Sequence, residues 1–150
     1  MIAAHGPPAS RLIIEITEES LIADQGQART ILTRLRQAGI RLSVDDFGTG
    51  YSSLAYLRDL PIDELKLDRF FVAGMRESPR SVKLVRSIIA LAHGQGMSVV
   101  AEGVEDDDTL QDLAGLGCDL AQGFHLCRPV PAAQLEAWLT ARTANSTPVT

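Results

Sequence analysis

The fold is decided by the stretch Ser43-Val44-Asp45-Asp46-Phe47-Gly48-Thr49-Gly50, which follows the mainly apolar residues 40–42. An apolar run ends in two adjacent carboxylates and then in two glycines, a pattern typical of a buried strand that leaves a sheet and turns sharply. Neighbouring strand side chains point to opposite faces, so Asp45 and Asp46 converge on one target only if the chain kinks here. Such a pair is tolerated around a divalent cation, a shared proton or a basic group. Taken alone, it more often represents a helix cap beside a solvated carboxylate.

Composition limits the classes of function. The 150 residues are 45% hydrophobic and 22% charged, enough for one globular domain with a core. The net charge of −5, without a stripe of basic residues, argues against duplex nucleic acid as a partner, whereas a nucleotide held through metal ions stays compatible. No apolar run is long enough to cross a bilayer, so we expect no membrane segment and a cytoplasmic location. Cys118 and Cys127 are interpreted as packing residues in a reducing compartment, with a lone disulfide as the alternative.

Five strand-helix units follow one another along the chain. Strands are expected at residues 12–16, 40–44, 65–68, 98–102 and 118–122. Helices are expected at residues 27–38, 54–60, 81–93, after the acidic residues 106–108, and from Pro131 onward. Residues 69–78 are expected to form a connection. The domain should span residues 12–142, between a lead-in at 1–11 and a flexible tail at 143–150.

Polar side chains close every one of these strands: Glu15, Asp45 with Asp46, Lys66 with Asp68, Glu102, and Gln122. Alternating strands and helices predict a parallel sheet with right-handed crossovers. In a parallel barrel, all carboxyl ends of the strands open onto one face, so these residues would meet around one cavity. An open doubly wound sheet would instead place a glycine-rich loop after the first strand, where residues 17–19 are Thr-Glu-Glu. We therefore expect an α/β fold, a partial TIM-like barrel of about five parallel strand-helix units.

Five co-linear motifs make the chain resemble the EAL domain family, which comprises cyclic di-GMP phosphodiesterases built on a barrel. The motifs lie at residues 15–18, 45–54, 65–69, 101–105 and 122–124, the last followed by Arg128-Pro129. The resemblance runs from about Gly6 to Leu139 and covers the carboxyl-terminal part of the family's domain. It implies a two-metal hydrolase that uses Mg²⁺ or Mn²⁺ to convert cyclic di-GMP to the linear dinucleotide pGpG.

The resemblance also implies a role for each matching residue. Glu15, Asp45 and Asp46 would bind metal, because carboxylate oxygens suit hard cations. Lys66 would position the attacking water and offset phosphate charge, and Glu102 would act as general base. Loop-anchoring or supporting roles would fall to Glu18, Asp68, Glu105 and Gln122. Substrate contacts would come from Gln122, Gly123 and Phe124.

The amino-terminal part of the family's barrel has no counterpart in these 150 residues. The Glu-Ala-Leu segment, with a metal-binding Glu and a substrate-contacting Arg, is missing, as is an Asn ligand. Individual losses of affinity multiply, so we expect low activity or none from this chain by itself. The alternatives are a catalytically silent module that binds cyclic di-GMP or a partner protein, and a truncated product without an evolved role. Open strand edges and the loop at residues 47–53 would favour a homodimer or other self-association.

Overall fold

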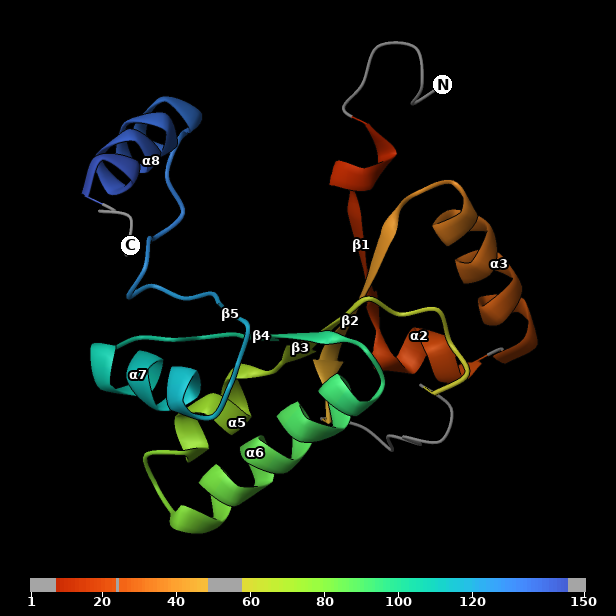
Figure 1. Ribbon diagram of the computed structural model, residues 1–150, viewed down its shortest axis with the longest axis horizontal. Helices are drawn as coiled ribbons and strands as arrows, with labels where there is room; N and C mark the ends of the chain where they lie inside the picture. The colour runs from red at the N-terminus through yellow and green to blue at the C-terminus, as the bar shows by residue number, and fades with distance from the viewer. Residues whose placement is uncertain (1–7, 24, 49–57, 146–150) are drawn as a thin grey trace.

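The computed structural model describes residues 8–23, 25–48 and 58–145 (Figure 1). Its strands are β1 (Ile13–Thr17), β2 (Arg41–Phe47), β3 (Glu64–Leu67), β4 (Ser98–Ala101) and β5 (Leu120–Ala121). Its helices are η1 (Ala9–Arg11), α2 (Glu18–Ala23), α3 (Gln25–Gln37), α5 (Arg69–Gly74), α6 (Pro79–Gly94), α7 (Asp107–Gly115) and α8 (Ala132–Asn145).

The five strands form one sheet in the order β1-β2-β3-β4-β5, and every neighbouring pair is parallel. Chain order and spatial order therefore coincide, as in a barrel wall and unlike a doubly wound sheet. This arrangement confirms the predicted fold class, a partial TIM-like barrel. Figure 1 shows α8 set apart from the sheet at the end of an extended segment.

The two faces of the sheet differ in character. On β3, Leu65 and Leu67 are fully buried in the main apolar cluster, which also includes Val85 and Ile89 of α6. Lys66 lies between the two leucines and therefore points to the opposite, inner face. Helices cover the apolar face, and the inner face carries polar side chains such as Lys66 and Glu64 beside apolar ones such as Val100. No helix in the described part of the chain is long and apolar enough to cross a membrane.

Strand β2 differs from the prediction at its carboxyl end. The strand was expected to end at Val44, but it continues through the acidic pair to Phe47. Its register with β3 is irregular between Val44 and Phe47, and Asp46 has a φ of 54°. The expected kink therefore lies inside the strand, where a bulge re-aims the side chains without ending the pairing.

Other element bounds also differ. Residues 69–74 form helix α5 and not a connection, because the Asp68 carboxylate caps the helix by accepting the Phe70 N–H at 2.8 Å. Residues 18–23 form an unexpected helix, α2, and β5 has only two residues where five were expected. Helix α8 extends to Asn145, into the predicted tail. Most of the predicted helix at residues 54–60 lies outside the described residues.

Asp119 links the end of α6 to the sheet at the amino ends of the strands. Its Oδ2 lies 2.8 Å from His93 Nε2 and accepts the Val99 N–H at 2.8 Å. The hydrogen bond with His93, followed by the one from Val99, lowers the pKa of the Asp119 carboxyl below its ordinary value of 3.8. The ionised carboxylate therefore stabilises the fold above that ordinary pKa, and this contribution is lost as the pH falls through the lowered value.

Asp119→Asn is expected to lower the free energy of unfolding by about 1 kcal/mol at pH 7, since an exposed, charge-assisted contact is weakened. The difference from the natural chain should vanish well below pH 4, where both are neutral at this position. Urea denaturation at pH 7 and at low pH measures this difference in the free energy of unfolding. Asp112→Asn, at an exposed position of α7, is the control. An equal deficit at both pH values would contradict this interpretation.

Candidate functional site

Lys66 occupies the centre of the inner face of the sheet. It is the third residue of β3, the middle strand, and its side chain is only 7% exposed. A lysine is rarely buried unless its ammonium group is paired. The side chains around Lys66 therefore define what this face of the sheet can bind.

Three carboxylates from three other strands surround the Lys66 ammonium. Nζ lies 3.0 Å from Glu15 Oε2 on β1, 3.2 Å from Asp45 Oδ1 on β2, and 2.7 Å from Glu102 Oε1, one residue beyond β4. We call these four residues the Lys66 cluster. Three carboxylates and one ammonium leave the cluster with a net charge of −2.

The surroundings of Lys66 favour its charged form. Burial by itself lowers the pKa of the ammonium, but the hydrogen bonds with Glu102, Glu15 and Asp45 outweigh burial and raise the pKa well above its ordinary value of 10.5. The Lys66 ammonium is therefore charged at neutral pH. Its physical effect is to hold three mutually repelling carboxylates together.

The Glu18 side chain holds the turn that follows β2. This buried carboxylate, the first residue of α2, accepts the Gly48 N–H at 3.0 Å. The backbone N–H of Asp46 donates to Asp45 Oδ1 at 3.1 Å, and the Asp46 side chain is exposed. The structure thus brings Asp45 into the Lys66 cluster and leaves Asp46 beside it. Most of the predicted anchored loop lies within residues 49–57, outside the described residues.

An open cleft of about 460 Å³ runs over the inner face of the sheet. Glu15, Lys66, Gln122 and Gly123 line it, together with residues of β4 and the segment after β5. Residues of both outer strands, β1 and β5, therefore line the same cleft. Buried Glu64, which sequence reasoning missed, also lines the cleft and pairs with Arg41 at 3.4 Å. Its position two residues before Lys66 was the available signal, because alternate strand residues share a face.

Other predicted site residues lie outside this cleft. Asp68 and Glu105 line a different hollow of about 630 Å³ between α5 and the start of α7. Phe124 is half exposed, and the Arg128 guanidinium lies 4.5 Å from its ring centroid. This stacked pair presents a flat, cationic surface beyond the end of β5.

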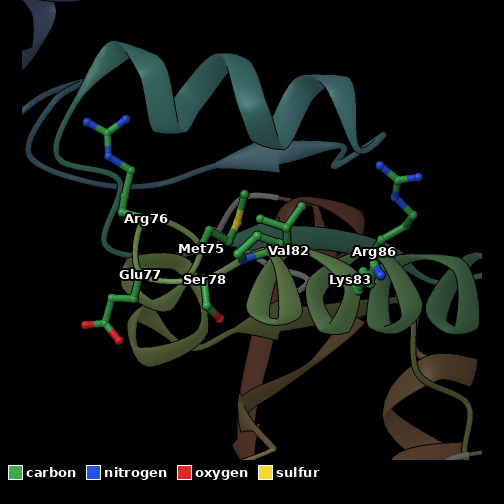
Figure 2. Close-up of a pocket in the computed structure, with 8 residues that line it drawn as sticks. Met75, Arg76, Glu77, Ser78, Val82, Lys83 and Arg86 are labelled. Carbon is green, nitrogen blue, oxygen red and sulfur yellow. The ribbon is translucent and has the colours of Figure 1, made fainter.

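A third hollow, of about 520 Å³, lies along the turn between α5 and α6 (Figure 2). Arg76, Lys83 and Arg86 line it around apolar Met75 and Val82. Figure 2 shows Arg76 and Arg86 extending from opposite ends of the hollow. None of its lining residues belongs to the Lys66 cluster, so it is not part of the candidate site.

The donor set of the Lys66 cluster suits a divalent cation. Within residues 8–23, 25–48 and 58–145, no group of His, Cys, Asp or Glu side chains is already arranged as a metal site. Instead, the Lys66 ammonium occupies the point that Glu15, Asp45 and Glu102 share. Carboxylate oxygens are the ligands that hard cations prefer, and the net charge of −2 matches one such ion. The residues therefore fit a divalent metal that binds beside Lys66 or displaces it.

Comparison with known proteins identifies the family. The profile of the EAL domain matches residues 1–129. The chain is 46% identical over 143 residues to the cyclic di-GMP phosphodiesterase NbdA of Pseudomonas aeruginosa, covering 95% of this chain and 18% of that protein. It is 46% identical over 127 residues to the cyclic di-GMP phosphodiesterase RocR of the same organism, covering 85% and 32%. The chain thus spans less than a third of the length of these relatives.

Solved structures agree with the sequence comparison. The PaMucR phosphodiesterase in complex with c-di-GMP superposes with a TM-score of 0.84 at 42% identity, covering 89% of this chain and 54% of that one. The manganese and cyclic di-GMP complex of Klebsiella pneumoniae BlrP1 superposes with a TM-score of 0.76 at 36% identity, covering 82% and 31%. BlrP1 is therefore solved with a divalent metal and the dinucleotide together. The chain belongs to the EAL domain family, of which it forms a partial domain.

Proposed function

We propose that this chain provides the carboxyl-terminal half of a cyclic di-GMP phosphodiesterase site, which yields pGpG with the help of Mg²⁺ or Mn²⁺. The Lys66 cluster is the observation that carries the proposal, since three strands aim carboxylates at one point beside an open cleft. The relatives that are named phosphodiesterases or solved with cyclic di-GMP support the choice of substrate.

Each residue of the cluster has a role that follows from its position. Glu15 and Asp45 would hold the metal, with Asp46 beside them as a further ligand. A bound divalent ion would polarise a phosphoryl oxygen and favour ionisation of a water molecule. Lys66, a permanent cation, would offset phosphate charge and orient the attacking water. Glu102 lies within hydrogen-bond distance of Lys66 and would accept the proton of a water molecule that the ammonium orients.

Three further groups would support these residues. Glu18 fixes the backbone of Gly48 and so the direction in which β2 ends. Gln122 and Gly123 line the cleft and are placed to contact a bound dinucleotide. The ring of Phe124, stacked under Arg128, offers a platform for a base beyond the cleft.

Glu102→Gln is expected to reduce pGpG formation by about 100-fold or more, because an amide cannot accept the proton from water. Purified chain is incubated with cyclic di-GMP and Mn²⁺, and the product is measured by chromatography. Glu77→Gln, at an exposed carboxylate on the turn between α5 and α6, is the control and should retain most of the product. Equal product from the natural chain and Glu102→Gln would contradict the role of Glu102.

A catalytically silent module that binds cyclic di-GMP or a partner protein is the second candidate. The observation that favours it is that the Lys66 ammonium lies at the point where the three carboxylates meet. Among the described residues, no His, Cys, Asp or Glu side chains are already arranged as a metal site. Isothermal titration with cyclic di-GMP separates the two functions. Binding without product in the presence of Mn²⁺ supports the silent module, and product supports the enzyme.

Self-association of the chain also follows from its open sheet. β1 and β5 are the two outer strands, and they expose Ile13 to 42% and Leu120 to 53%. Unpaired strand edges with exposed apolar side chains favour pairing with another chain. We expect sedimentation velocity at micromolar concentration to detect a homodimer or larger species. A well-folded monomer across that range would count against this proposal.

A further inference from the structure

The first turn of α5 lies directly against the turn that follows β2. Gly48 has a φ of +92°, and a Cβ placed on it would lie 2.7 Å from Cζ and 2.8 Å from Cε2 of Phe71. The Phe71 ring therefore packs onto the bare backbone of Gly48. In addition, the Gly48 N–H donates a hydrogen bond to the Glu18 carboxylate at 3.0 Å. Gly48 is thus clamped between α2 and α5, two residues beyond the acidic pair Asp45-Asp46.

The same turn of α5 also packs against the turn that follows β4. Gly103 has a φ of +70°, and a Cβ placed on it would lie 2.5 Å from the Cβ of Arg69 and 3.3 Å from its Cα. Gly103 comes directly after Glu102, which makes the shortest contact in the Lys66 cluster. One short helical turn therefore touches the backbone beside the carboxylates on both sides of Lys66.

This turn is itself firmly placed. It begins three residues after Lys66, and Asp68 caps it by accepting the Phe70 N–H. Val72, at 1% exposure, fixes α5 to the core, whereas Phe70 is 75% exposed. The first turn of α5 is therefore fixed to β3 and to the core, and it contacts the backbone turns at Gly48 and Gly103.

We propose that Arg69 and Phe71 are positioning residues that set the separation of Asp45 and Glu102 around Lys66. Arg69 packs on Gly103 and so fixes the backbone that carries Glu102 just beyond β4. Phe71 packs on Gly48 and so fixes the carboxyl end of β2, which carries Asp45. Neither residue lines the cleft over the inner face or belongs to the Lys66 cluster. The proposal rests on the proposed function only where it concerns metal affinity, because the geometry of the cluster exists without metal.

Phe71→Ala compared with Val72→Ala tests the proposal. Both changes remove a packed side chain from α5, but only Phe71 contacts Gly48. Phe71→Ala is expected to weaken Mn²⁺ binding about tenfold, as loss of a residue that orients metal ligands does. It should also broaden the ¹H–¹⁵N signal of the Lys66 ammonium, which is sharp only while its three partners hold it. Val72→Ala should lower thermal stability, yet leave Mn²⁺ affinity within about twofold and the ammonium signal intact.

A rescue variant separates positioning from simple loss of packing. Phe71→Leu keeps an apolar body against Gly48 and should restore most of the Mn²⁺ affinity and the ammonium signal. The proposal is overturned if Phe71→Ala leaves both readouts unchanged, or if Val72→Ala loses both to the same extent. Should the natural chain bind no Mn²⁺, the proposed metal function fails, and the metal-free ammonium signal still decides whether Phe71 positions the cluster.

Discussion

Lys66→Met is expected to lower the free energy of unfolding by about 2 kcal/mol at pH 7. Removing one partner of a fully buried ion pair costs about 3–5 kcal/mol, and partial exposure of the carboxylates reduces that figure through solvent screening. Glu15 is half exposed at 51%, whereas Asp45 and Glu102 are about a quarter exposed or less. The variant leaves three carboxylates close together without their shared cation, and their mutual repulsion opposes folding.

The raised pKa of Lys66 determines how this effect depends on pH. A group whose pKa is higher in the folded state stabilises the fold fully below its unfolded pKa, here about 10.5. The stabilisation is lost only as the pH rises through the folded value. The deficit of Lys66→Met should therefore be constant from pH 6 to pH 9.

Denaturant unfolding of Lys66→Met beside Lys83→Met measures the effect. Lys83 is an exposed lysine on α6, and its replacement should change stability by less than about 0.5 kcal/mol. Added Mn²⁺ should stabilise Lys66→Met more than the natural chain, because the variant cluster carries one more uncompensated negative charge. Equal stability of the two variants would show that the cluster does not depend on its cation.

Gly123→Ala is expected to lower the free energy of unfolding by about 3 kcal/mol, the upper part of the range for inserting an atom where the backbone is already closely packed. A Cβ on Gly123 would collide with the backbone N, C and O atoms of Val104. The backbone of Val104 is fixed in place, since its N–H donates to Gln122 O at 3.1 Å and its carbonyl accepts the His125 N–H at 3.1 Å. Neither segment can move without breaking the contact between the ends of β4 and β5.

Gly115→Ala is the matched control for this substitution. Gly115 ends α7, and a Cβ placed on it meets no atom within 4 Å. Alanine at such a position should be neutral or stabilising by up to about 1 kcal/mol, because it lowers the entropy of the unfolded chain. Thermal unfolding of both variants tests the pair. A destabilisation of similar size in both would mean that the contact with Val104 is not the cause.

The strand-helix order was predictable because it depends on short-range patterns. Leu65, Lys66 and Leu67 alternate faces in the sequence as they do in the sheet, so the direction of Lys66 could be inferred. The convergence of Glu15, Asp45 and Glu102 followed from one topological rule about parallel strands. The metal and catalytic roles of these residues remain proposals.

Features that depend on long-range contacts could not be predicted. The bulge that separates Asp45 from Asp46 depends on how β2 pairs with β3, which the sequence of β2 alone does not specify. The short pattern of residues 69–74 predicts a connection where the structure has helix α5, although the Asp68 cap is visible in the sequence. The contacts of Phe71 with Gly48 and of Arg69 with Gly103 join distant segments and require the fold itself.

The most direct test of the account is Mn²⁺ binding by the purified chain, followed by electron paramagnetic resonance. The account predicts bound Mn²⁺ in the natural chain and loss of that signal in Asp45→Asn, which removes an anionic ligand from the Lys66 cluster. Asp112→Asn, on the exposed surface of α7, should bind as the natural chain does. Absence of bound Mn²⁺ in the natural chain, or equal binding by both variants, would contradict a metal site at Glu15, Asp45 and Glu102.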